Sequence, residues 1–291
     1  MTAFDSAPNS PDDSSRNALG EWMDKNRFLL RRLHSLSGIV FGGYIVVHLL
    51  VNATLLEMQL PFLFGGEAGN VYQNQVNKIH DLPFLIVIEL TAIIFPILFH
   101  AIYGTMIVIA GRPNVGNYGY AKNWAYFWQR VTSIILLAFI AFHVMSMKGL
   151  FGGTLGTHLT FVPKGYAAES TVNHMQAAWW VGWVVYPLGI LAATFHLANG
   201  FWTAAVTWGL TIGAKSQKLW GYACVGLFLF TFGCGMGTLL ATLAQDDYFD
   251  DAAVVKAQRD GYDAEAGYSE LLDEDDSPET YNPDDSLEGL E

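Results

Sequence analysis

Apolar and polar positions along the chain separate into long blocks. Five apolar stretches lie at about residues 33–56, 82–110, 127–148, 178–211 and 219–244. Crossing the roughly 30 Å hydrocarbon layer of a bilayer takes about 20 helical residues, so this pattern predicts five transmembrane helices. The fourth stretch is long for one span, but no polar break divides it. We therefore expect one tilted helix there that projects beyond the bilayer.

Composition agrees with an integral membrane protein. Of the 291 residues, 52% are hydrophobic and only 14% are charged, which is unusual for a soluble protein of this size. The polar N-terminal segment contains no apolar core of a secretory signal. The sequence thus predicts an all-α protein with a flexible cytoplasmic extension over residues 1–26 and a membrane domain of five helices over residues 27–245.

The net charge of −12 comes from the C-terminal end of the chain. Residues 246–291 hold 17 acidic and two basic residues, a formal charge of −15, which leaves +3 for residues 1–245. Such a segment has the composition of a disordered chain. We expect an acidic, disordered tail that is either a solvated extension or a docking segment, and no nucleic-acid partner.

Basic residues beside the spans predict the orientation. They gather before the first span, between the second and third, and between the fourth and fifth: Lys25, Arg27, Arg31, Arg32, Arg112, Lys122, Arg130, Lys215 and Lys218. The other two connections hold only Lys78, Lys148 and Lys164. By the positive-inside rule, the N-terminus faces the cytoplasm of a bacterial cell and the acidic tail lies outside.

Four histidines lie within apolar stretches, one in each of the first four predicted helices: His48, His100, His143 and His196. Burying a polar group without a partner costs roughly 2–7 kcal/mol, so each imidazole needs a compensating interaction. A single buried histidine is usually explained by a hydrogen bond to a neighbouring helix. Four of them, on four different helices, favour a shared chemical role.

The depth of each histidine follows from the helical rise of 1.5 Å per residue. Counted from the outer end of its helix, His48 lies about 13 Å deep and His143 about 7 Å, whereas His100 and His196 lie about 28 Å and 25 Å deep. The histidines therefore form an outer pair and an inner pair, separated by about 16 Å along the membrane normal.

Two histidines at one level on facing helices are what a six-coordinate haem requires, because the iron takes one imidazole nitrogen on each axial side. Two such haems across a bilayer would form an electron path. The chain has no CxxCH motif, which excludes covalent c-type attachment. Cys224 and Cys234 lie about 15 Å apart along one predicted helix, too far for a disulfide, and we expect them to be packing residues.

Glycines and arginines could support such haems. Small residues that allow close approach of a helix or a flat macrocycle are Gly38, Gly42, Gly43 and Gly189. Haem propionates need cations, and the cations expected at the inner rim are Arg31, Arg32 and Arg130. The alternative role for these arginines is membrane topology and contact with lipid headgroups.

Several motifs together resemble one protein family. The strings RRLHSLSG (31–38), HLLVN (48–52), FPILFHAIYG (95–104), NWAYFWQRVTSI (123–134), FHV (142–144), FHLANGFWTAAVTWGLT (195–211) and SQK (216–218) closely resemble the single-chain, five-helix cytochrome b subunit of bacterial succinate dehydrogenases and fumarate reductases. The similarity runs over most of residues 28–240. It departs from compact members in the N-terminal extension, in the outer loop at 149–177 and in the tail.

The resemblance implies cofactors and partners. In that family the four membrane histidines ligate two b haems, which assigns His48 and His143 to the outer haem and His100 and His196 to the inner one. A flavoprotein oxidises succinate, an iron–sulfur subunit relays the electrons, and the cytochrome passes them to a quinone, commonly menaquinone. The whole complex could form an oligomer. Two alternatives stay open: the cytochrome b subunit of a formate dehydrogenase or hydrogenase, and a haem-free anchor.

Glu89 is the one carboxylate well inside a predicted span. An intramembrane ionisable group is a candidate for proton handling; the alternative is a neutral acid bonded to a neighbouring helix. Glu89 lies eleven residues before His100, about 16 Å toward the outside, and so level with the outer histidine pair. Since reducing a quinone requires protons, we expect Glu89 beside the quinone site or on its proton path.

Overall fold

The computed structural model describes residues 20–23, 25–64, 70–111, 114–149 and 160–245. All regular structure in these ranges is helical. Most of the predicted N-terminal extension and the acidic tail, residues 1–19 and 246–291, lie outside the described residues, although residues 20–23 of that extension are helical. The two boundaries drawn on the sequence for a flexible extension and a disordered tail stay predictions.

Five helical segments of the described chain are long and apolar enough to cross a membrane, as the hydropathy pattern predicted: Arg27–Met58, Leu85–Ala110, Ala121–Met147, Val181–Thr207 and Ala214–Leu243. The third and fifth begin about six residues before their apolar stretches, because the helices continue through polar first turns. The fourth is shorter than expected. It ends because Gly209 takes a left-handed conformation (φ +73°) and Leu210 donates to the carbonyl of Ala205, which stops a helix.

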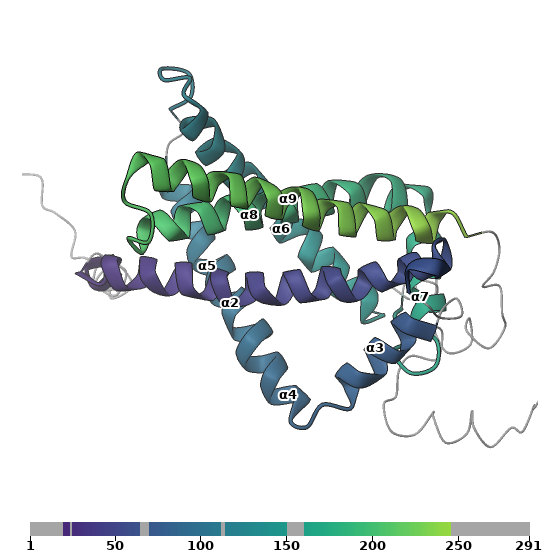
Figure 1. Cartoon of the computed structure of the whole chain (residues 1–291). Helices are drawn as coiled ribbons and strands as arrows, with labels where there is room; N and C mark the ends of the chain where they lie inside the picture. Colours follow the sequence, from purple (N-terminus) through teal and green to yellow (C-terminus); the bar gives the residue numbers. More distant parts are fainter. Residues whose placement is uncertain (1–19, 24, 65–69, 112–113, 150–159, 246–291) are drawn as a thin grey trace, which may run out of the picture.

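These segments contain most of the elements named in Figure 1. The first consists of α2 (Arg27–Ala53) and a 3-10 turn, η1 (Thr54–Met58). The second consists of α4 (Leu85–Ile88), a π-helical turn η3 (Glu89–Ile94) and α5 (Phe95–Ala110). The third is α6 (Ala121–Met147), the fourth joins a π-helical turn η5 (Val181–Val185) to α8 (Tyr186–Thr207), and the fifth is α9 (Ala214–Leu243).

The four helices that carry His48, His100, His143 and His196 close a ring. Helix α2 contacts α5 and α8, and α6 contacts the same two helices. Helix α9 packs outside this ring, against α8 and α2, and Figure 1 shows α2 and α9 running along the length of the molecule. The arrangement leaves the interior of a four-helix ring as the place where side chains of four segments meet.

A proline follows each π-helical turn. Pro96 comes two residues after η3, and Pro187 comes two residues after η5. Proline has no N–H to donate, and its ring clashes with the carbonyl four residues before it. A widened π turn relieves that clash without ending the helix. The sequence FPILFH and the sequence YPLGIL therefore create the same local irregularity in two spans.

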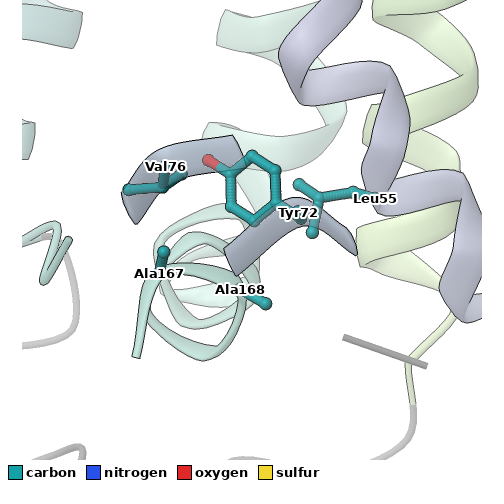
Figure 2. Close-up of a cluster of buried hydrophobic side chains, with 5 residues drawn as sticks. All are labelled: Leu55, Tyr72, Val76, Ala167 and Ala168. Atoms are coloured by element: carbon teal, nitrogen blue, oxygen red, sulfur yellow. The ribbon is translucent and has the colours of Figure 1, made fainter. Parts of the chain in front are cut away.

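Two short helices cover one end of the ring: α3 (Asn70–His80) and α7 (Ala167–Gln176). We call them the α3–α7 cap. Figure 2 shows the buried cluster that joins them to η1, the turn that follows α2: Leu55, Tyr72, Val76, Ala167 and Ala168. The carboxylate of Glu57, fully buried, accepts hydrogen bonds from the backbone N–H groups of Val71 (3.0 Å) and Tyr72 (2.9 Å). It thereby satisfies free donors in the first turn of α3. The hydropathy pattern did not predict either helix of this cap.

Candidate functional site

The ring brings four half-buried histidines together as two pairs. His48 on α2 faces His143 on α6, with ring centroids 6.0 Å apart and an interplanar angle of 76°. His100 on α5 faces His196 on α8, with ring centroids 6.2 Å apart and an angle of 84°. The first pair lies toward the α3–α7 cap. These are the two pairs that the depth count along the predicted helices put at the same level. Each pair joins two different spans.

These spacings fit two axial ligands on one iron. Two metal–nitrogen bonds of about 2 Å, plus roughly 1 Å from each nitrogen to its ring centre, separate the ring centroids by about 6 Å. Within the described residues there is no group of three or more His, Cys, Asp or Glu side chains that could hold a metal ion. A haem needs only two protein ligands, because the porphyrin supplies the other four nitrogens. The assignment of the histidines as ligands fits this geometry and stays a prediction.

The His100–His196 pair is held by main-chain carbonyls. Nδ1 of His100 lies 3.0 Å from the carbonyl oxygen of His34, and Nδ1 of His196 lies 3.2 Å from that of Gln129. A carbonyl only accepts, so both imidazoles carry their proton on Nδ1 and donate it. Nε2 of each ring is then the unprotonated nitrogen that a metal requires.

His143 is held by side chains instead. Its Nδ1 lies 2.9 Å from the hydroxyl of Tyr186, and that hydroxyl lies 2.8 Å from Nε2 of His174 on α7. Tyr186 and His174 are 4% and 0% exposed. The α3–α7 cap is thus connected to one member of the nearer histidine pair by a buried chain of two short hydrogen bonds.

His48 differs from the other three histidines. Its Nε2 lies 3.4 Å from Nδ2 of Asn52, which also donates to the His48 carbonyl at 2.7 Å. The contact between Asn52 and the imidazole of His48 is long, and a bound iron would take its place at Nε2. The hydroxyl of Tyr72 on α3 lies 3.5 Å from Oδ1 of Asn52 and 3.5 Å from Oγ1 of Thr171. Burial raises the pKa of Tyr72 to about 12, which keeps this hydroxyl protonated.

A fifth histidine lies beside the His100–His196 pair. The ring of His34 stacks on that of His100, with centroids 4.0 Å apart and an angle of 14°. Its Nδ1 is a buried polar atom without a partner, a state it shares among the described residues with Oγ1 of Thr211. An unpaired buried polar atom costs about 1–3 kcal/mol, and an acceptor on a bound group would remove that cost. The packing is tight, since a Cβ on Gly38 would lie 2.6 Å from Cε1 of His100.

The three arginines expected at the propionates have different surroundings. Arg130 donates to the carbonyls of Val108 and Gly111 and to the hydroxyl of Tyr126. Arg32 donates to the carbonyl of Thr207 and lies over the rings of Phe28 and Trp208, 5.0 Å from each centroid, and Arg31 is exposed. Since Arg32 and Arg130 tie helix ends together, the propionate role stays a prediction.

Glu89 is half-buried and begins the π-helical turn η3. It interacts electrostatically with Tyr44 on α2, whose ring centroid lies 5.6 Å from that of His48. It also interacts with His80, at the end of α3. Glu89 therefore lies within electrostatic range of a side chain beside the histidine pair at the cap end and of a histidine outside the spans.

Sequence reasoning did not identify the residues that support the histidines. Tyr186 and His174 lie on opposite sides of the short turn that precedes η5, and no local pattern pairs them. His174 was visible as a histidine in an otherwise uncharacterised loop, and Tyr186 as an aromatic residue next to a proline inside a span. Asn52 and Gln129 carry polar amides within helices, which was the available signal for partners of the histidines.

Comparison with known proteins agrees with these features. No family model and no solved structure matches the chain. A curated relative, the succinate dehydrogenase cytochrome b558 subunit of Bacillus subtilis (strain 168), is 31% identical over 221 residues, which cover 75% of this chain and 99% of that protein. The match extends over almost the entire relative, as the motif resemblance predicted. The chain therefore belongs to the family of succinate dehydrogenase cytochrome b subunits.

Proposed function

We propose that this chain is the membrane anchor of a succinate:quinone oxidoreductase and carries electrons from an iron–sulfur subunit, through two b haems, to a membrane quinone, commonly menaquinone in this family. One observation carries the proposal: four histidines from four spans form two pairs with centroid spacings of 6.0 and 6.2 Å. The relative's name, which includes both succinate dehydrogenase and cytochrome b, supports it.

The chain's own residues prepare both sites for iron. A bound haem would supply one-electron chemistry and would be held by His48 with His143 or by His100 with His196. The carbonyls of His34 and Gln129 fix the protons of His100 and His196 on Nδ1, and Tyr186 orients His143. The rings of His100 and His196 therefore present Nε2 before the cofactor binds, which reduces the ordering that binding requires.

The proposed partners bind at the end opposite the α3–α7 cap. A cytoplasmic flavoprotein and the iron–sulfur subunit would dock there, in the cytoplasmic membrane of a bacterium. Basic residues gather at this end, where α6 and α9 begin: Lys122, Arg130, Lys215 and Lys218. They would steer an acidic docking surface. Co-purification with a flavoprotein supports this choice of partner, and purification with a formate dehydrogenase or hydrogenase subunit contradicts it.

Haem content of single variants tests the proposal. We expect two b haems per chain in the wild type, with the low-spin spectrum of six-coordinate iron. Replacing His100 or His196 by Ala should first remove the haem at the His100–His196 pair. Replacing His48 or His143 by Ala should first remove the haem at the His48–His143 pair. The control is His80→Ala, an exposed histidine outside the spans, which should keep both haems. Unchanged haem in all four variants contradicts the assignment and leaves a haem-free anchor.

We also propose that Glu89 serves the quinone reaction, at or near the end of the ring covered by the α3–α7 cap. Its interactions with Tyr44 and His80 support a proton path at that end. Glu89→Gln keeps the shape and removes the ionisable group. We expect succinate oxidation with quinone to fall, while oxidation with an artificial dye, which takes electrons before the membrane, stays unchanged.

Controls separate this role from failed assembly. Glu21→Gln removes an exposed carboxyl outside the spans and should leave both activities intact. Equal quinone activity in Glu89→Gln and wild type removes Glu89 from the mechanism. Equal loss of dye-linked and quinone-linked activity shows damage to the complex as a whole. The propionate role of Arg31, Arg32 and Arg130 is tested in the same preparations, since losing a propionate partner should lower the reduction potential of one haem only.

A further inference from the structure

The two histidine pairs differ in the groups that hold them. Main-chain carbonyls accept from Nδ1 of His100 and of His196, and only a longer contact of 3.4 Å joins Nδ1 of His196 to a side chain, the hydroxyl of Thr132. A backbone carbonyl is present whichever side chain its residue carries, so substitutions do not remove these acceptors. His143 instead depends on the hydroxyl of Tyr186, which depends in turn on His174. The pair nearer the α3–α7 cap is therefore sensitive to side chains, and one of these belongs to the cap itself.

In the hydrogen-bond chain from His143 through Tyr186 to His174, the chemistry of the three side chains determines which atom carries each proton. If His143 presents Nε2 to iron, its proton is on Nδ1, and the oxygen of Tyr186 must accept it. The hydroxyl of Tyr186 then has one proton left to donate, and Nε2 of His174 accepts it at 2.8 Å. Nδ1 of His143 donates, the hydroxyl of Tyr186 accepts and donates, and Nε2 of His174 accepts, so the donation runs in one direction from the ligand to the cap.

A histidine ligand becomes a stronger donor to iron when its other N–H is hydrogen-bonded to a good acceptor. The oxygen of Tyr186 becomes a better acceptor when its own proton is donated to His174, because hydrogen bonds in a chain polarise one another. Both bonds are short, and both supporting side chains are buried, so water does not compete with them.

We infer that His174 is a positioning residue that acts through Tyr186 to fix the orientation and the donor strength of His143, and so sets the reduction potential of the haem at the His48–His143 pair. This inference rests on the proposed function, because it concerns how a bound haem is held. A stronger axial donor stabilises the oxidised iron. The wild-type chain therefore lowers the potential of this haem relative to a protein without the His174–Tyr186 contact.

Redox titration of the intact complex tests the inference, with the second haem as an internal reference. Tyr186→Phe removes the acceptor for His143 and should raise the potential of the haem at the cap end. His174→Leu removes the next acceptor and should raise it by a smaller amount. His174→Gln keeps an acceptor oxygen in a side chain of similar size, so it should stay close to the wild type. The potential at the His100–His196 pair should not move.

A second readout follows ligand orientation directly. The electron paramagnetic resonance signals of oxidised low-spin haem depend on the planes of the axial imidazoles, so Tyr186→Phe should change one signal of the two. The control variant is Thr171→Val, on the same helix three residues before His174; it loses only the long 3.5 Å contact to Tyr72 and its bond to the carbonyl of Ala167. It should leave both potentials unchanged.

The outcomes separate this inference from the proposed function. If the histidine variants do not lose haem, the proposed function fails. If two haems are present and His174→Leu and His174→Gln behave alike, or both haems shift together, His174 has only a packing role and the inference is overturned. A shift confined to one haem, absent in His174→Gln and Thr171→Val, supports it.

Discussion

Two glycines of α2 lie five residues apart in very different surroundings. A Cβ on Gly38 would lie 2.6 Å from Cε1 and 2.8 Å from Nδ1 of His100, whereas a Cβ on Gly43 would meet nothing within 4 Å. Contacts below about 3 Å force a neighbour to move, and His100 is held by its bond to the His34 carbonyl. Gly38 therefore keeps the imidazole of His100 in place by leaving room for it.

This contrast gives a matched pair of substitutions. We expect Gly38→Ala to displace His100 and to lower haem occupancy at the His100–His196 pair, while the other pair keeps its haem. Gly43→Ala should leave both haems at wild-type levels. The pyridine haemochrome content and the low-spin spectrum of each purified variant measure the effect. Full haem occupancy in Gly38→Ala would contradict this prediction and show that the imidazole of His100 can move without loss of haem.

At the same scale, the sequence could predict which histidines pair, but it could not predict the side chains that contact them. A histidine inside an apolar stretch is conspicuous because nothing else explains it, and counting residues along straight helices was enough to sort His48, His100, His143 and His196 by depth. Tyr186 and His174 are unremarkable one at a time. Their role depends on a bend between α7 and η5 that returns the chain on itself, which no residue count conveys.

Among the elements, α3 depends on a residue outside itself. The first-turn N–H groups of Val71 and Tyr72 bond to the buried carboxylate of Glu57. Removing an acceptor from buried donors costs roughly 1–3 kcal/mol, so Glu57→Ala should loosen the start of α3. Hydrogen exchange should be faster at the amides of Val71 and Tyr72. Asn74→Ala, an exposed change on the same helix, should not alter that exchange.

The docking of α3 should also depend on pH. Burial raises the pKa of Tyr72 from 10.0 to about 12, so the neutral phenol is favoured in the docked helix. The stabilising effect of Tyr72 is complete below pH 10 and is lost between about pH 10 and 12, because the undocked phenol ionises first. Protease sensitivity of the α3 segment should rise over this interval. Tyr72→Phe should abolish that rise, and persistence of the rise would assign it to another group.

The spans were predictable as elements, but their internal geometry was not. Hydropathy marks the part of a helix that lies in hydrocarbon, so it found five segments and missed the polar turns at the start of α6 and α9. It also missed α3 and α7, since a short amphipathic helix has no long apolar run. Helix α3 bonds to Glu57 and packs against α7 in the cluster of Figure 2, and these contacts need the rest of the fold.

At the scale of the whole molecule, the two ends of the ring differ in kind. One end has basic residues at Arg32, Lys122 and Arg130, and the other is covered by the α3–α7 cap. From the positive-inside rule we expect the basic end to face the cytoplasm. Electrons from a soluble partner would then enter near the His100–His196 pair and leave near the His48–His143 pair.

Thiol labelling tests this orientation. In a background where Cys224 and Cys234 are replaced, single cysteines at two exposed positions, Ser216→Cys at the start of α9 and Asn77→Cys on α3, report on the two ends. A membrane-impermeant maleimide added to intact cells should label Asn77→Cys and spare Ser216→Cys until the cells are opened. The reverse pattern would place the cap inside the cell and invert the proposed electron path.

The π-helical turn before Pro96 has a consequence for how this span can vary. A π turn holds one residue more than the α-helix it interrupts, and one residue corresponds to a rotation of about 100° and a step of 1.5 Å. Deleting one residue within η3 would thus rotate residues 85–89 about the helix axis relative to α5. His100, which lies after the turn, would keep its position opposite His196. An insertion or deletion at this turn would therefore change the direction in which Glu89 points and leave the register of His100 unchanged, so the two halves of this span can vary independently.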